Sequence, residues 1–127
     1  MKIPVIFNEF DRKRFNFIKV FIDDCRLDSE VLLYNYHAFR LIKLLKKKEI
    51  QLDYIFVDLP YIKVKDKVNK YDEILSRIDS SSILKSDGTI IIQHFKGNRL
   101  SSITGRLVLT VTKRYGTSCL SIYKNRL

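Results

Sequence analysis

The sequence DYIFVDLPY, at residues 53–61, is the stretch that decides the fold. Its apolar run, residues 54–57, is short and bulky, as is typical of a strand buried on both faces of a parallel sheet. Asp58 ends the run, and Pro60 prevents a regular continuation because proline has no amide hydrogen to donate. Ligands of open α/β sheets bind beyond the carboxyl ends of the strands, so we expect this aspartate at a functional edge.

Strands and helices are expected to alternate on both sides of this stretch. Short apolar runs predict strands at residues 3–8, 30–36, 53–58 and 89–95. Apolar residues between them recur at the spacing of amphipathic helices: Phe15, Ile18, Ile22 and Cys25; Ala38, Leu41, Ile42 and Leu45; Tyr71, Ile74, Leu75 and Ile78. Asp11 is predicted to cap the first helix, because its carboxylate can accept hydrogen bonds from amides of the first turn.

The last third of the chain has a different pattern. Residues 80–88 are expected to be a loop with an Asp-Gly turn, and residues 95–105 give no firm prediction. Two runs, residues 107–113 and 117–123, flank Arg-Tyr-Gly and predict an antiparallel hairpin closed by a glycine turn. The whole pattern predicts an α/β sandwich with a mainly parallel sheet and a terminal hairpin, in one domain of residues 1–127.

Net charge is the most informative bulk property of the chain. Its 127 residues carry 24 Lys and Arg against 14 Asp and Glu, a formal charge of +10. A field of that sign favours a polyanionic partner, usually nucleic acid, over a basic surface that is only solvated. Three consecutive lysines, residues 46–48, fit a helix C-terminus as well as an RNA contact.

Signals for membranes and metals are missing from the sequence. No apolar run approaches the roughly 18 residues of a membrane span, and the start does not read as a signal peptide, so we expect a cytoplasmic protein. Cys25 and Cys119 are far apart, which predicts reduced core thiols. With His37 and His94 they lack ligand spacing, so no metal site is expected. His94 is predicted to be a polar strand-end residue rather than a catalytic base, and Tyr115 to pack on the sheet, with contact to RNA as the alternative.

The order of these motifs resembles a known family. A strand, Asp-Leu-Pro-Tyr, a helix, SDGTIIIQH (residues 86–94) and KRYGTSCLSIY (residues 113–123) are similar to the bacterial 16S ribosomal RNA guanine-N2 methyltransferases. Those enzymes use S-adenosylmethionine, have a Rossmann-like fold, and carry Asp-Pro-Pro-Tyr or Asp-Pro-Pro-Phe after the fourth strand. The resemblance therefore implies methyl transfer to guanine N2 in 16S rRNA of the small ribosomal subunit.

The resemblance places catalysis at Asp58, Leu59, Pro60 and Tyr61. The Asp58 carboxylate and the Leu59 carbonyl would accept the two hydrogens of the guanine amine, which directs its lone pair toward the methyl group. Tyr61 would stack on the base, as aromatic side chains do with unstacked bases. Nearby lysines are expected to bind RNA phosphates: Lys63, Lys65 and Lys67.

The resemblance also places the cofactor. Glu9, with Phe10 beside it, falls where the family binds the ribose hydroxyls, and a carboxylate can accept from two adjacent hydroxyls. His37 and Ala38 fall on the Asp-Ala pair whose aspartate meets the adenine amine. A neutral imidazole keeps one acceptor nitrogen for that amine. Asp58 completes the expected cofactor-binding set.

The chain departs from the family pattern at the place of the glycine-rich cofactor loop. The family's first strand and that loop would precede residues 3–8, and this chain has no glycine before Gly88. The missing strand lies in mid-sheet in the family fold, so its absence would leave two strand edges unpaired or force them together. Leu59 also replaces the first proline, although the backbone carbonyl survives and the residue before Pro60 is still held extended.

Three hypotheses follow for this chain. In the first, it is the methyltransferase and a second chain supplies the missing segment, or that segment is lost from the gene model. In the second, it is a truncated and inactive relative that retains RNA binding. In the third, it is a basic RNA-binding module without catalytic ancestry, and Asp-Leu-Pro-Tyr is an ordinary turn.

Overall fold

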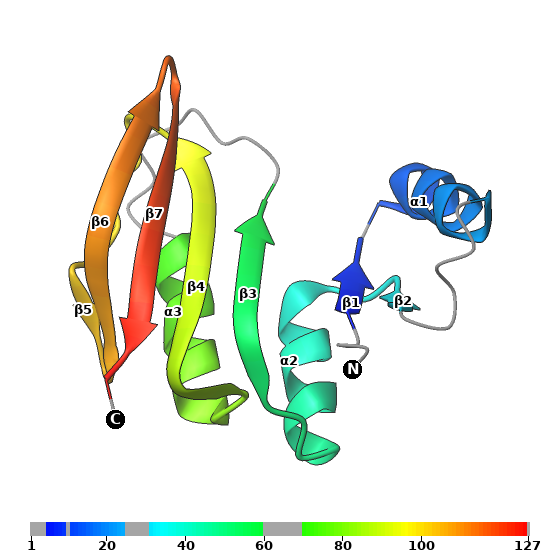
Figure 1. Cartoon of the computed structure of the whole chain (residues 1–127), viewed down its shortest axis with the longest axis horizontal. Coiled ribbons are helices and arrows are strands. Elements are labelled where there is room, and N and C mark those ends of the chain that lie inside the picture. The colour runs from blue at the N-terminus through cyan, green and yellow to red at the C-terminus, as the bar shows by residue number, and fades with distance from the viewer. Residues whose placement is uncertain (1–4, 10, 25–30, 60–69, 127) are drawn as a thin grey trace. The chain divides into compact units, whose positions relative to one another are not determined.

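The computed structural model (Figure 1) describes four segments of the chain: residues 5–9, 11–24, 31–59 and 70–126. The chain divides into two compact units, Met1–Leu44 and Leu45–Leu127. Each unit is described by itself below. Within the described segments, no helix combines the length and the apolar character needed to cross a membrane.

The first unit is a strand–helix–strand element followed by the beginning of another helix. Its elements in chain order are β1 (Val5–Asn8), α1 (Arg12–Asp24), β2 (Val31–Tyr34) and α2 (Ala38–Lys47), whose last three residues belong to the second unit. β1 and β2 pair in parallel, with Val5 opposite Val31 and Asn8 opposite Tyr34. Parallel strands need a crossover connection, which α1 provides, so the predicted alternation of strand and helix is confirmed here.

Helix α1 begins where the sequence predicts. The Arg14 amide donates to Asp11 Oδ2 at 3.0 Å, so the predicted N-cap is confirmed. Ile22 is buried, whereas three apolar side chains on the same helix are exposed: Phe17, Val20 and Phe21.

The second unit is a five-stranded sheet with one helix. Its elements are β3 (Leu52–Asp58), α3 (Lys70–Ser81), β4 (Leu84–Phe95), β5 (Ile103–Thr104), β6 (Leu107–Tyr115) and β7 (Ser118–Asn125). The strand order is β3-β4-β7-β6-β5. β3 and β4 are parallel, and the remaining pairs are antiparallel. The predicted strand around residues 53–58 and the terminal hairpin are both confirmed.

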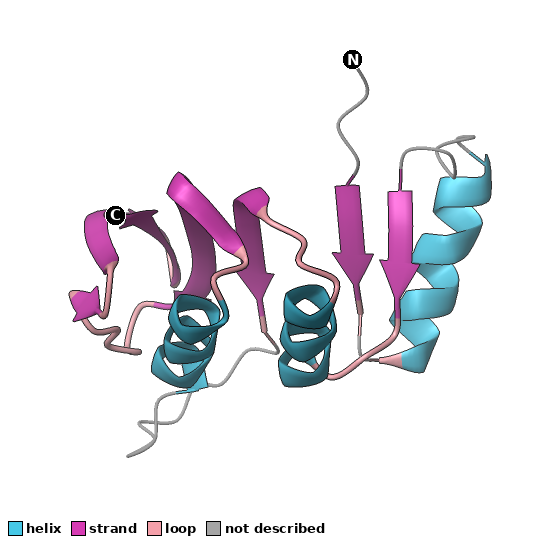
Figure 2. Ribbon diagram, turned by 90° about the horizontal axis from the view of Figure 1, so that it is seen from below, coloured by secondary structure: helices cyan, strands magenta, loops and turns pink. Residues whose placement is uncertain are grey.

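The two faces of this sheet differ. Figure 2 shows α3 against one face, and the side chains directed there include Ile90, Ile92 and Tyr123, each fully buried. Residues on the other face alternate with these along each strand. On that face Tyr54 is 73% exposed and Phe56 is 59% exposed. We call this second surface the open face, because no helix of the second unit covers it within the described residues.

The start of β4 differs from the sequence prediction. Residues 84–88 were expected in a loop, but β4 begins at Leu84, which pairs with Leu52. The Leu52 amide also donates to the Ile83 carbonyl at 2.7 Å, which extends the pairing before the irregular turn. Asp87 adopts a positive φ of 61° in that turn. Apolar residues at 83 and 84 therefore outweigh the local turn signal, and the loop prediction is wrong for residues 84–88.

The strands of the described residues form two separate sheets. β1 pairs with β2, and β3 is the outermost strand of the five-stranded sheet. One edge of β1 and one edge of β3 therefore have no strand partner among the described residues.

Candidate functional site

Asp58 occupies the carboxyl end of β3, as the sequence predicts. It is the last residue of the strand and lies opposite Gln93 of β4. Val57 before it is buried, and because successive side chains alternate, Asp58 projects to the open face, where it is exposed. No described cation forms an ion pair with it. The carboxylate is therefore available to accept hydrogen bonds from a ligand at the strand end, and Leu59 beside it is partly buried.

Glu9 follows β1 and is fixed by contacts to its backbone. Its amide donates to the Tyr34 carbonyl at 3.0 Å, and Asn35 Nδ2 donates to the Glu9 carbonyl at 2.6 Å. The side chain is 26% exposed, and Arg14 Nη1 lies 3.9 Å from Oε1. This ion pair is long, so it leaves most of the acceptor capacity of the carboxylate unused. Its position and chemistry fit the binding of vicinal hydroxyls.

A clamp between Asn8 and Tyr36 joins the ends of the two parallel strands. Asn8 Nδ2 donates to the Tyr36 carbonyl at 2.8 Å, and the Tyr36 amide donates to Asn8 Oδ1 at 3.0 Å. The Tyr36 ring stacks on Tyr34 at 5.5 Å, and the Arg40 guanidinium lies 5.0 Å from its centroid. The clamp therefore sets the turn that leads into α2. Sequence reasoning missed Asn8, and the only signal was a polar residue at the end of an apolar run.

His37 caps helix α2. Its Nδ1 accepts from the Phe39 amide at 3.3 Å, and its carbonyl accepts from the Leu41 amide at 3.0 Å. In the neutral ring that uses Nδ1 as an acceptor, the proton resides on Nε2. His37 therefore presents a donor rather than the acceptor expected for an adenine amine. Ala38 is the first residue of α2.

His94 belongs to a buried polar network. Nδ1 donates to the Phe95 carbonyl at 2.9 Å, and Nε2 lies 2.7 Å from Ser121 Oγ, which in turn contacts Thr112 Oγ1 at 3.0 Å. His94 is only 4% exposed, and the Tyr71 ring lies 5.9 Å from its ring. Both nitrogens are used inside the fold, which supports the structural role predicted for it.

The remaining predicted residues have mixed outcomes. Cys119 is a buried, unpaired thiol, as predicted. Tyr115 is 60% exposed, so the prediction that it packs on the sheet is wrong. No group of three or more potential metal ligands occurs among the described residues. Several predicted site residues lie outside the described residues: Phe10, Cys25, Pro60, Tyr61, Lys63, Lys65 and Lys67.

Comparison with known proteins places the chain in a family. The family model described as "Conserved hypothetical protein 95" matches residues 3–124. A protein of Bacillus subtilis (strain 168), named "Putative rRNA methyltransferase YlbH", is 31% identical over 121 residues. Those residues are 95% of this chain and 63% of the relative, so the chain spans less than two thirds of that relative's length.

Two solved structures establish the likeness of fold. A conserved hypothetical protein of Streptococcus pyogenes is similar with a TM-score of 0.82 and 21% identity, covering 97% of this chain and 72% of that one. A protein of Streptococcus mutans described as a "putative sam-dependent methyltransferase" has a TM-score of 0.73 and 13% identity, covering 95% of this chain and 38% of that one. The predicted α/β fold of the Rossmann-like methyltransferase type is confirmed. The chain belongs to the family of the matching model, and its resemblance to ribosomal RNA methyltransferases is thereby confirmed.

Proposed function

We propose that this chain carries the catalytic part of an S-adenosylmethionine-dependent methyltransferase that modifies guanine N2 in 16S rRNA of the small ribosomal subunit. The observation that supports this most is the position of Asp58, exposed at the carboxyl end of β3. Most known ligands of such sheets bind at that edge. We further propose that residues 1–127 act as one partial methyltransferase domain in the cytoplasm.

The proposed chemistry activates a weak nucleophile. The lone pair of a guanine amine is delocalised into the base, so the amine needs its hydrogens bound in order to attack. The Asp58 carboxylate accepts one hydrogen and the Leu59 carbonyl the other, and the rate comes from positioning and electrostatics. The carbon–sulfur bond of the donor breaks as the carbon–nitrogen bond forms, and Asp58 is placed to take the proton that the amine then loses. By this proposal, Pro60 would hold Leu59 extended and Tyr61 would stack on the guanine.

The described residues fit part of the cofactor. S-adenosylmethionine supplies the methyl group when bound. The Glu9 carboxylate would accept from its ribose hydroxyls, with Phe10 and Ala38 beside the adenosine. His37 Nε2 would donate to a ring nitrogen of adenine rather than accept from the amine, because its Nδ1 caps α2. Residues 1–127 contain no glycine before Gly88, so the glycine-rich segment that cradles the methionine end in the family is not among them.

The RNA-binding part of the proposal rests on charge. The net charge of +10 favours an RNA substrate, and Lys63, Lys65 and Lys67 would hold phosphates close to the reacting base. These contacts carry no sequence information, so base selection would fall to Tyr61 and the Asp58 end of the strand.

Methyl transfer tests this proposal. Tritiated S-adenosylmethionine and 30S particles would be incubated with the chain, with and without a co-expressed segment that carries the family's glycine-rich loop. Label should enter the RNA, and Asp58→Ala should reduce transfer by about 100-fold or more. Asp53→Ala is the matched control, because Asp53 is an exposed carboxylate on the same strand that pairs with Lys85 at 3.5 Å. Absence of transfer even with the added segment would refute the proposal.

A second candidate is an inactive relative that retains RNA binding. It is favoured by the edges of β1 and β3, each of which has no strand partner within the part of the chain that the structure describes. Calorimetry with S-adenosylmethionine separates the two. Micromolar binding by the 127-residue chain would exclude the inactive form, whereas absence of binding with and without the glycine-rich segment would favour it.

A further inference from the structure

The turn of the β6–β7 hairpin lies at the same end of the sheet as Asp58. Phe95 of β4, Ser118 of β7 and Tyr115 of β6 are partners in one row across the sheet. Asp58 is opposite Gln93, two residues before Phe95. Figure 1 shows the hairpin tip at the end to which the β3 and β4 arrows point. The hairpin is therefore a neighbour of the proposed reaction site within the second unit.

Lys113 shares both the face and the row of Asp58. Successive partners across the sheet are Asp58, Gln93, Leu120 and Lys113. Partners in one row project to the same face, so Lys113 lies on the open face. Three strand spacings of ~4.8 Å separate the two backbones by about 14 Å. Tyr115, two residues further along β6, projects to the same face nearer the tip.

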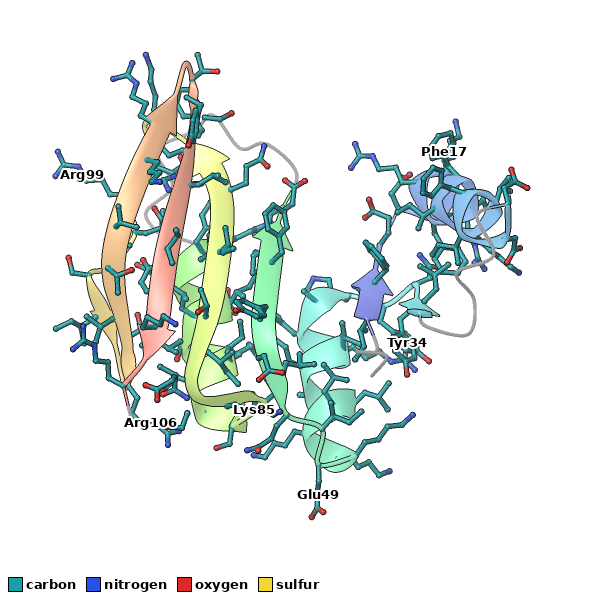
Figure 3. All side chains as sticks on the ribbon, viewed as in Figure 1. Phe17, Tyr34, Glu49, Lys85, Arg99 and Arg106 are labelled. Carbon is teal, nitrogen blue, oxygen red and sulfur yellow. The ribbon has the colours of Figure 1, made fainter. Side chains whose placement is uncertain are left out.

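Lysines and arginines lie at both ends of the sheet. At the end opposite the hairpin turn, Lys85 pairs with Asp53 at 3.5 Å, and Arg106 Nε lies 3.5 Å from Asp79 Oδ1. Figure 3 labels Lys85 and Arg106 at that end. At the hairpin end, Lys96 and Lys113 are exposed and form no ion pair with a carboxylate of the described segments. These two lysines are therefore available to contact a polyanion at the Asp58 end of the sheet.

Tyr115 presents an exposed ring beside these cations. It is 60% exposed, and it precedes Gly116, whose φ of 62° closes the turn. A side chain at position 116 would meet no other atom within 4 Å, so the tip of the hairpin is surrounded by solvent. Arg114 Nε donates to the Gly116 carbonyl at 3.0 Å and fixes the turn. The exposed ring therefore lies beside a hydrogen-bonded turn, where an unpaired base can stack on it.

We propose that Lys96, Lys113 and Tyr115 form an RNA-binding surface for nucleotides that flank the target guanine. Lys113 and Lys96 contact backbone phosphates, and Tyr115 stacks on an unpaired base. The partner is therefore RNA with a single-stranded loop rather than a continuous duplex. This inference rests on the proposed function, because it takes RNA as the substrate and Asp58 as the reaction site.

Fluorescence anisotropy tests the surface without the methyl donor. The probe is a labelled RNA stem-loop with an unpaired guanine, and a fully paired RNA of equal length is the comparison. Lys113→Glu should weaken stem-loop binding about tenfold and lower the slope of log affinity against log salt by ~0.7, the value for one phosphate contact. Tyr115→Ala should weaken it about 5- to 150-fold, whereas Tyr115→Phe should retain binding.

Lys124→Glu is the matched charge control. Lys124 is exposed on the same face of the sheet, four residues beyond Leu120 along β7 and so about 13 Å from that row. Equal weakening by Lys124→Glu and Lys113→Glu would overturn the proposal, because it would indicate a general effect of charge. Unchanged binding by Tyr115→Ala would also overturn it. The binding assay contains no methyl donor, so its result is independent of the tritium-transfer assay. RNA binding that depends on the hairpin, together with no transfer of label in the tritium assay, would count against the proposed reaction and not against this surface.

Discussion

The two units of the chain bury their apolar residues to very different extents. In the second unit, Leu75, Ile90 and Ile92 are completely buried between α3 and the five-stranded sheet. In α1 of the first unit, only Ile22 is buried, while Phe17 is 75% exposed and Phe21 is 57% exposed. Both units have strands and helices with the expected periodicity, so local pattern alone does not account for the difference.

The number of strands in each sheet explains this contrast. A two-stranded sheet is marginal in water, because it offers one helix too little surface to bury against. Five strands with a helix on one face can enclose a core, although the open face of that sheet still exposes Tyr54 and Phe56. Burial of an apolar residue thus depends on which other elements are present, and not on its local pattern alone.

The largest expected effect is on the second-unit core. Ile90→Ala should lower the free energy of unfolding by about 3–4 kcal/mol, since it removes a fully buried side chain and leaves a cavity. Phe17→Ala should change it by less than about 0.5 kcal/mol, because that ring is already in water. Urea denaturation of both variants measures the difference. Similar decreases in the free energy of unfolding for the two variants would contradict the difference in burial between the two units.

Stability at alkaline pH tests the contribution of the buried Tyr123 hydroxyl in the second unit. Burial, and secondarily the Asp72 carboxylate, raise the pKa of Tyr123 to about 12. Its hydroxyl donates to the Ser101 carbonyl at 2.7 Å. The folded pKa is above the ordinary value of 10, so this stabilisation is complete below pH 10 and is lost as the pH rises toward 12. The loss amounts to about 2–3 kcal/mol.

Tyr123→Phe is the control for that titration. It removes the ionisable group and should make stability less dependent on pH between pH 10 and 12, at a cost of about 1 kcal/mol near neutrality. Thermal unfolding across this range compares the two proteins. Parallel pH profiles for the two proteins would show that Tyr123 ionises as readily in the folded state as in the unfolded one.

The smallest expected effect concerns the first unit. Asp11→Ala should destabilise α1 by about 1 kcal/mol, because the Arg14 amide loses its side-chain acceptor. Asp23→Ala, near the other end of α1, removes a carboxylate from the negative end of the helix dipole and should be neutral or slightly stabilising. Amide hydrogen exchange in α1 measures both. Equal protection of the α1 amides from exchange in the two variants would contradict the capping role of Asp11.

Sequence reasoning succeeded where the signal was local. The apolar run before Asp58, the Asp11 cap and the glycine turn at Gly116 each depend on a few adjacent residues. It failed where the partner is distant in sequence. Leu84 belongs to β4 because it pairs with Leu52 of β3, which lies thirty-two residues earlier in the chain.

At the candidate functional site, too, local features were predicted and contacts between distant segments were not. The position of Asp58 at a strand end followed from its neighbours, but the Asn8–Tyr36 clamp and the capping role of the His37 ring depend on how the segments meet in space. The exposure of Tyr115 also depends on what lies beside the hairpin. An aromatic residue in a turn has the same local sequence whether its ring packs on the sheet or projects into solvent.

Analysis of the methylated nucleoside tests the central claim about Asp58 most directly. RNA from 30S particles treated with the chain, S-adenosylmethionine and the glycine-rich segment would be digested and examined by mass spectrometry. The account predicts N2-methylguanosine with the wild-type chain and with Asp53→Asn, and at least a 100-fold lower yield with Asp58→Asn at saturating donor. A methyl group on another base, or an undiminished yield with Asp58→Asn, would contradict the account.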